Sequence, residues 1–127
     1  MRKEKENGDL RMRTKEFALR IIRLYAALPK TTEAQVIGKQ VLRSGTSVGA
    51  HYREAYRSRS DAEYIAKIRG GLQELEETSY WLELLGDAAI VNGDRLAELR
   101  DEAEELTAIL VACSRTAVNN KGQRTEE

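Results

Sequence analysis

The sequence contains few of the residues that cross-link small domains or shape strands and turns. Its 127 residues include one cysteine, one proline, one histidine and only 6% aromatic residues. The lone cysteine, Cys113, has no second cysteine in the chain to pair with, so we expect a reducing, cytoplasmic environment. Because aromatic residues are scarce and Ala, Leu, Glu and Arg are abundant, the composition favours helices over strands.

Long apolar runs are also missing. No stretch approaches the roughly 18 apolar residues of a membrane span, and the charged N-terminus has no apolar segment typical of a signal peptide. With 41% hydrophobic and 33% charged residues, the chain has the composition of one all-α domain that buries enough apolar surface to fold. We therefore expect no association with membranes.

The formal net charge is zero, yet the charges are divided between the two halves of the chain. Residues 1–69 contain 16 Lys and Arg against 8 Asp and Glu, whereas residues 70–127 contain 5 against 13. Such a division indicates either a basic nucleic-acid surface or two halves that attract each other. The zero net charge favours the second interpretation, because non-specific nucleic-acid binding depends on a surplus of cations.

Four helical patterns joined by short turns predict an antiparallel, up-down four-helix bundle over residues 14–118. The first helix is expected to begin with Thr14 as N-cap and to stop before Pro29, since proline disfavours helix in the preceding residue. The charged segments 1–13 and 119–127 lack periodicity, and we expect them to be flexible tails.

Capping residues predict the limits of the other helices. Thr32–Gln35 and Ser60–Glu63 have the spacing of capping boxes and predict two helix starts. Asn92 is expected to end the third helix in a left-handed conformation, and Asp94 is expected to be the N-cap of the fourth.

The predicted core residues recur at spacings of three and four along each helix. They are Phe17, Ile21, Leu24 and Leu28; Ala34, Ile37, Val41, Ser44, Val48 and Ala55; Ile65, Ile68, Leu72, Leu75, Ser79, Leu82, Gly86 and Ala89; and Leu96, Leu99, Ala103, Leu106, Leu110, Cys113 and Ala117. Gly45 and Gly49 accompany the second set and are expected to let a neighbouring helix approach closely.

The third helix has more apolar surface than one core requires. Tyr80, Trp81, Leu84, Leu85 and Ala88 form a second apolar group beside the core positions. One interpretation is that Trp81 covers the end of the bundle. We favour the other, that these residues form a contact between subunits, because clustered aromatic residues and leucines mark interfaces.

The residue types that most often catalyse reactions or bind metals do not occur in the patterns that these functions require. A di-metal site in a helical bundle needs two inward Glu-x-x-His pairs, but His51 is the only histidine and has no carboxylate three positions before it. Cys113 occupies a core position where a thiol is inert. Gly45-x-x-x-Gly49 lacks the Lys-Ser/Thr of a phosphate-binding loop. We therefore expect no catalytic residues, no metal and no cofactor.

One row of cations has the form of a binding surface. Lys39, Arg43, Arg53 and Arg57 lie on one side of the second helix, opposite its core residues. The row is about 27 Å long at 1.5 Å per residue, so it could follow a nucleic-acid backbone. It could equally pair with acidic residues of a neighbouring helix or subunit. We favour pairing and keep RNA binding as the alternative.

Several strings of residues resemble a known family. They are Leu28-Pro-Lys30, Leu42-Arg-Ser-Gly-Thr-Ser-Val-Gly-Ala-His-Tyr-Arg-Glu-Ala55, Lys67-Ile68 and Leu75-x-Glu-Thr-x-Tyr-Trp-Leu-x-Leu85. The chain resembles the four-helix-bundle proteins of bacterial 23S rRNA intervening sequences, with His51 where asparagine is usual.

This resemblance implies a homo-oligomeric, pentameric ring of bundles with no established biochemical activity and no catalytic residues. A distant relative with this fold partners a reverse transcriptase and contacts nucleic acid. The expected partners are therefore copies of the chain itself and, as the alternative, RNA or a nucleic-acid enzyme.

Overall fold

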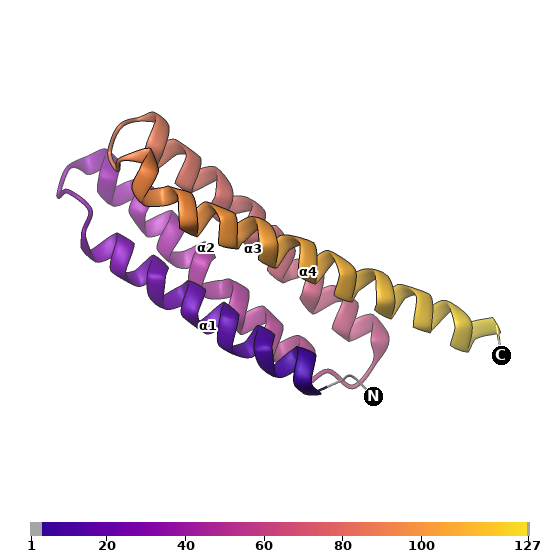
Figure 1. The fold of residues 1–127 in the computed structure, drawn as a ribbon. Helices are drawn as coiled ribbons and strands as arrows, with labels where there is room; N and C mark the ends of the chain where they lie inside the picture. The colour runs from indigo at the N-terminus through magenta and orange to yellow at the C-terminus, as the bar shows by residue number, and fades with distance from the viewer. Residues whose placement is uncertain (1–3, 127) are drawn as a thin grey trace.

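The computed structural model describes residues 4–126, and the side chains of residues 9–122. Four helices account for nearly all of this range: α1 (Glu4–Ala26), α2 (Thr32–Tyr56), α3 (Asp61–Asp87) and α4 (Gly93–Glu126). They lie lengthwise against one another as a four-helix bundle, and the C-terminal end of α4 projects beyond the other three (Figure 1). No helix among the described residues is long and apolar enough to cross a membrane.

The contacts between helices follow the order of the chain. α2 and α3 share the most extensive contact, α1 packs on α2, α4 packs on α3, and α1 and α4 touch least. Where α2 packs on α1, Gly45 and Gly49 of α2 lie against Ile21 and Thr14 of α1, and Gly38 of α2 lies against Leu28, two residues after the end of α1. From Gly38 to Gly49 the residue numbers increase along α2, while those of the contacting residues decrease from 28 to 14. These two helices therefore run in opposite directions.

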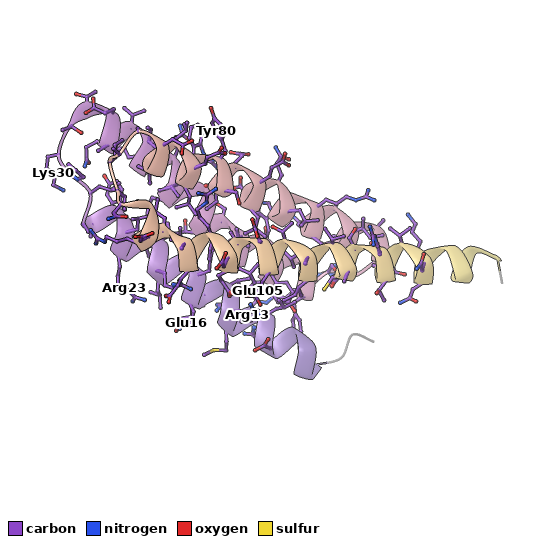
Figure 2. The ribbon with its side chains drawn as sticks, turned by 45° about the horizontal axis from the view of Figure 1, so that its top comes forward. Arg13, Glu16, Arg23, Lys30, Tyr80 and Glu105 are labelled. Carbon is purple, nitrogen blue, oxygen red and sulfur yellow. The ribbon has the colours of Figure 1, made fainter. Side chains whose placement is uncertain are left out.

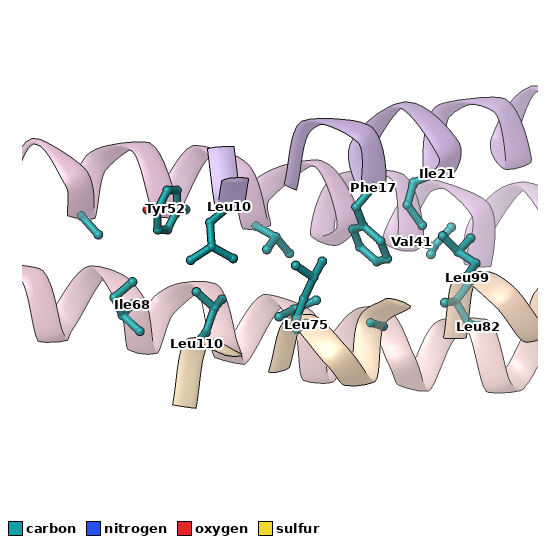
Figure 3. Close-up of a cluster of buried hydrophobic side chains, with 14 of the residues drawn as sticks. Leu10, Phe17, Ile21, Val41, Tyr52, Ile68, Leu75, Leu82, Leu99 and Leu110 are labelled. Carbon is teal, nitrogen blue, oxygen red and sulfur yellow. The ribbon is translucent and has the colours of Figure 1, made fainter. Parts of the chain in front are cut away.

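The core contains most of the apolar residues predicted from the periodicity, with additions at both ends; the prediction that Ala89 is a core residue is wrong, because it is exposed in the turn after α3. Phe17, Ile21, Val41, Leu75 and Leu82 are fully buried at its centre (Figure 3). Tyr52 and Leu10 extend the cluster toward the end where α1 begins. The predicted core residues Leu24, Ile37 and Leu72 are only partly buried, and they pack around the rim of the cluster.

The first helix begins ten residues before the predicted start. The assignment of Thr14 as an N-cap is wrong, because its side chain is fully buried and its hydroxyl donates to the carbonyl of Leu10 at 2.7 Å. Thr14 instead continues the buried stripe of Leu10, Phe17 and Ile21 and packs against Gly49. The segments expected to be tails are largely helical: residues 4–13 belong to α1 and residues 119–126 to α4; residues 1–3 and 127 lie outside the described range.

Of the two predicted capping boxes, one has its N-cap displaced by one residue and the other has its N-cap confirmed. The N-cap of α2 is Thr31, whose hydroxyl accepts from the amide of Ala34, and not Thr32. The side chain of Gln35 donates to the carbonyl of Pro29 rather than closing a capping box. Ser60 caps α3 as predicted, with its hydroxyl accepting from the amide of Glu63 at 3.1 Å.

The turn between α3 and α4 reverses the roles predicted for its residues. Asn92 does not end α3; its side-chain oxygen accepts from the amide of Asp94 at 2.9 Å and so caps α4. The left-handed residue is Ala89, with φ 57°. The amides of Ala89 and Ile90 donate to the carbonyls of Gly86 and Leu85, each at 3.0 Å. These are the two hydrogen bonds of a Schellman motif, built here without its usual glycine.

Replacing Ala89 with glycine is expected to raise the free energy of unfolding by about 0.5–1 kcal/mol. A left-handed L-residue costs about 1–2 kcal/mol, and the extra freedom of glycine in the unfolded chain offsets part of the gain. Ala88→Gly is the matched control. Ala88 immediately precedes Ala89 but has a φ of −82°, so glycine at this position should only lower the free energy of unfolding. Urea denaturation of the three proteins measures the difference, and equal effects at both positions would contradict the assignment.

Candidate functional site

The four cations predicted as a row are all exposed on the outward side of α2 or just beyond its end. Arg43 contacts α3, where its guanidinium lies 3.2 Å from a carboxylate oxygen of Glu74 and 2.7 Å from one of Glu77. Arg57 is the C-cap of α2. Lys39, Arg53 and Arg57 make no ion pair with the described residues. One cation of the row, Arg43, therefore joins α2 to α3. The other three are open to solvent.

A second ion pair links the two helices that touch least. The guanidinium of Arg13 on α1 donates to both carboxylate oxygens of Glu102 on α4, at 3.1 and 2.6 Å, and lies 3.5 Å from Glu105 (Figure 2). The hydrogen bond that Arg13 donates to Glu102 raises the pKa of Arg13. Both cross-helix arginines come from the basic half of the chain and both sets of acids from the acidic half. The structure thus contains the attraction between halves that the charge division indicated.

The second apolar group on α3 is only partly a surface. Leu85 belongs to the core with no exposed area, so its assignment to a subunit contact is wrong. Tyr80 is 54% exposed, Leu84 is half-buried and Ala88 is exposed. Trp81 packs against the core cluster, and its ring centroid lies 5.2 Å from that of Tyr80. Trp81 Nε1 is buried and has no hydrogen-bond partner among the described residues.

A shallow groove of about 740 Å³ lies along this side of α3. It is lined by Arg69, Leu72, Gln73, Glu76, Glu77, Tyr80 and Trp81. The polar members recur at spacings of three and four, which is the signal in the sequence that could have extended the Tyr80–Trp81 surface toward the start of α3. Apolar clustering alone did not find them. We refer to these seven residues as the α3 groove.

Polar residues between α2 and α3 fit the two helices together. The hydroxyls of Ser44 and Thr78 lie 2.7 Å apart in the buried interface. The ring of His51 covers Gly70 so closely that a Cβ at that position would lie 2.8 Å from the ring. His51 Nδ1 is buried without a hydrogen-bond partner among the described residues. The Gly70-Gly71 pair therefore does not break α3; it provides the space in which the imidazole packs.

His51 and Cys113 are the one histidine and the one cysteine of the chain, and both lie in its described part. There, no three His, Cys, Asp or Glu side chains gather as they would to hold a metal ion. Cys113 is partly buried and packs against the core cluster, and Ser114 beside it is buried. Burial raises the pKa of the Tyr52 phenol well above its usual range, so the phenol is neutral at physiological pH.

The sequence model of the 23S rRNA-intervening sequence protein family matches residues 6–112. The chain belongs to this family. A crystal structure of a protein of unknown function from the S23 ribosomal protein family of Bacteroides thetaiotaomicron VPI-5482 is similar to the chain, with 35% sequence identity and a TM-score of 0.81. The similarity covers 86% of this chain and 97% of that one. No curated protein matches this chain significantly.

The residues by which this 23S rRNA-intervening sequence protein resembles its family are chiefly packing residues. Within the string from Leu42 to Ala55, every buried position faces the core or a neighbouring helix: Ser44, Gly45, Val48, Gly49, Tyr52 and Ala55. The family match ends at residue 112, whereas α4 continues to Glu126. The string from Leu42 to Ala55 therefore contains the packing positions of the C-terminal half of α2.

Proposed function

We propose that this protein is a non-enzymatic assembly unit, an up-down antiparallel bundle that associates with copies of itself into a pentameric ring in the cytoplasm. The observation that carries the proposal is the Tyr80–Trp81 pair in the α3 groove. A tyrosine ring 54% exposed against a half-buried tryptophan is the composition of an interface centre. The pentameric assembly is proposed because membership of this family implies it.

The surroundings of the histidine, serine and threonine side chains support the proposal that the protein is not an enzyme. The ring of the one histidine packs against Gly70, and its Nδ1 makes no hydrogen bond with the described residues. A nucleophile needs a base within hydrogen-bonding reach. The buried hydroxyls of Ser44 and Thr78 are within 2.7 Å of each other, which supports a structural role for that polar pair.

Light scattering on the eluting protein tests the assembly directly. One chain has a mass of 14.3 kDa, and the proposal predicts five times this value, about 72 kDa, at micromolar concentration. Tyr80→Lys is expected to reduce the mass without loss of helicity, because it places a charge in the proposed interface. A wild-type mass of 14.3 kDa throughout the micromolar range would refute the proposal.

The alternative is an RNA-binding accessory protein, supported by the three cations Lys39, Arg53 and Arg57 that are open to solvent. Arg43 supports it less, because that side chain is engaged with Glu74 and Glu77. The same measurement, repeated with a structured RNA at two salt concentrations, separates the two functions. A salt-dependent complex that Arg53→Glu with Arg57→Glu abolishes would assign the protein to RNA binding.

A further inference from the structure

The first helix has a second apolar strip that the sequence analysis did not identify. Met12, Leu19, Ile22 and Ala26 recur at spacings of seven, three and four on the side of α1 opposite Leu10, Phe17 and Ile21. Met12 is 60% exposed and Ile22 45% exposed, two of the five large hydrophobic side chains that the described part of the chain leaves open to solvent. We refer to these four residues as the α1 strip.

The α1 strip is not needed for the fold of a single chain. α1 already buries its other side against α2, with Ile21 on Gly45 and Leu28 on Gly38. Single exposed apolar residues are ordinary, but a periodic strip along one face of a helix indicates a surface that another helix or groove covers. The structure therefore contains two outward apolar surfaces, this strip and the α3 groove.

These two surfaces are complementary in length and charge. Met12 to Ile22 spans about 15 Å, and Arg69 to Trp81 in the groove about 18 Å, at 1.5 Å per residue. Beside the strip lie the exposed residues Lys15, Glu16 and Arg23, two bases and one acid. The groove contains Arg69, Glu76 and Glu77, one base and two acids.

The placement of the surfaces favours a head-to-tail contact. Tyr80 points away from the bundle at the edge opposite that of Glu16 and Arg23, so one chain can use both surfaces at once (Figure 2). A two-fold symmetric contact of the α1 strip with itself would place Lys15 of each copy near Arg23 of the other, and like charges oppose such a pairing. Opposite charges favour the pairing of α1 strip with α3 groove.

We propose that the α1 strip of one copy docks in the α3 groove of the next, so that the subunit contact is heterologous. This inference rests on the proposed self-association and specifies its surfaces. The strip would lie lengthwise along the groove, with one of its ends, Met12 or Ile22, against Tyr80 and Trp81 and with Lys15 and Arg23 along the side that contains Glu76 and Glu77. Each copy then contributes one strip and one groove, and the same contact repeats from copy to copy.

Two variants that each block one surface test the proposal. Met12→Glu with Ile22→Glu blocks the strip, and Gln73→Glu with Tyr80→Glu blocks the groove; all four positions are exposed or groove-lining on helices, where glutamate is well tolerated. Each variant alone is expected to elute as a 14.3 kDa monomer. Circular dichroism and thermal melting check that both remain folded.

Mixing the two variants gives the outcome that only a heterologous contact predicts. The intact groove of one variant and the intact strip of the other should form a dimer of twice 14.3 kDa and nothing larger, because both remaining surfaces carry added acids. Val36→Glu with Val118→Glu is the matched control: these side chains are 58% and 42% exposed but lie outside both surfaces, so the wild-type mass should be retained.

The outcomes separate this inference from the proposed function. A wild-type chain that is monomeric refutes self-association altogether. A wild-type oligomer whose mass is unchanged by Met12→Glu with Ile22→Glu overturns the strip alone and leaves assembly through another surface. Loss of assembly in both variants with no dimer on mixing overturns the heterologous pairing.

Discussion

Replacing Phe17 with alanine is expected to lower the free energy of unfolding by about 3–5 kcal/mol. Phe17 is the only phenylalanine in the chain, and it is fully buried at the centre of the bundle, near Ile21 and Val41 (Figure 3). Alanine loses the transfer free energy of the ring and leaves a cavity that four packed helices fill only in part. For a domain whose total stability is about 5–15 kcal/mol, such a loss leaves little of the folded state.

Two further variants make the Phe17 result interpretable. Phe17→Leu keeps most of the volume and should cost less than about 1.5–2 kcal/mol. Val36→Ala truncates an apolar side chain of α2 that is 58% exposed and should change stability by no more than about 0.5 kcal/mol. Chemical denaturation followed by circular dichroism gives all three values. Similar losses for Phe17→Ala and Val36→Ala would contradict the assignment of Phe17 to the core.

Replacing Gly45 with alanine is expected to destabilise the protein by about 1–2 kcal/mol, although alanine is the better helix former by about 1 kcal/mol. A Cβ at position 45 would lie 2.7 Å from Ile21 Cγ1 and 3.0 Å from Ile21 Cγ2. Both atoms are attached to the branched Cβ of Ile21, whose side chain has few alternative rotamers in a helix. α1 must therefore move away from α2, and overpacking of this kind costs about 1–3 kcal/mol.

A double-mutant cycle identifies the contact responsible. If Ile21 is the obstacle, Ile21→Ala should cost at least about 1 kcal/mol less in the Gly45→Ala protein than in the wild type, because the added methyl group fills part of the cavity. Gly86→Ala is the matched control: its Cβ would meet only Leu96 Cδ1, at an ordinary 3.5 Å, so the substitution should be neutral or stabilising. Strictly additive effects of Gly45→Ala and Ile21→Ala would show that the two residues do not meet.

Most of the core could be predicted from the sequence because a helix repeats locally. A side chain three or four positions from another lies on the same face whatever surrounds the helix. Phe17, Val41, Leu75 and Leu106 were identified in this way and are all fully buried. Ser60 was identified as a cap because its partner is the amide of Glu63, three residues along.

The candidate surfaces were predicted less completely, because a surface depends on what lies opposite each side chain. Lys39 and Arg43 share one side of α2, but only Arg43 reaches the acids of α3. Leu84 and Leu85 are neighbours in the sequence, yet Leu85 is fully buried and Leu84 is only half-buried. The α1 strip was missed because Met12 lies in a segment that, as a charged stretch, was not expected to be helical.

The sequence by itself determined that the chain forms four helices, which residues face inward along each, and to which family it belongs. These are properties of periodicity and of local strings of residues. Only the tertiary structure decided that Thr14 is a core residue against Gly49 rather than a cap, and that Gly70 makes room for His51. Those roles depend on contacts between residues tens of positions apart, and the packing of helices alone brings such residues together.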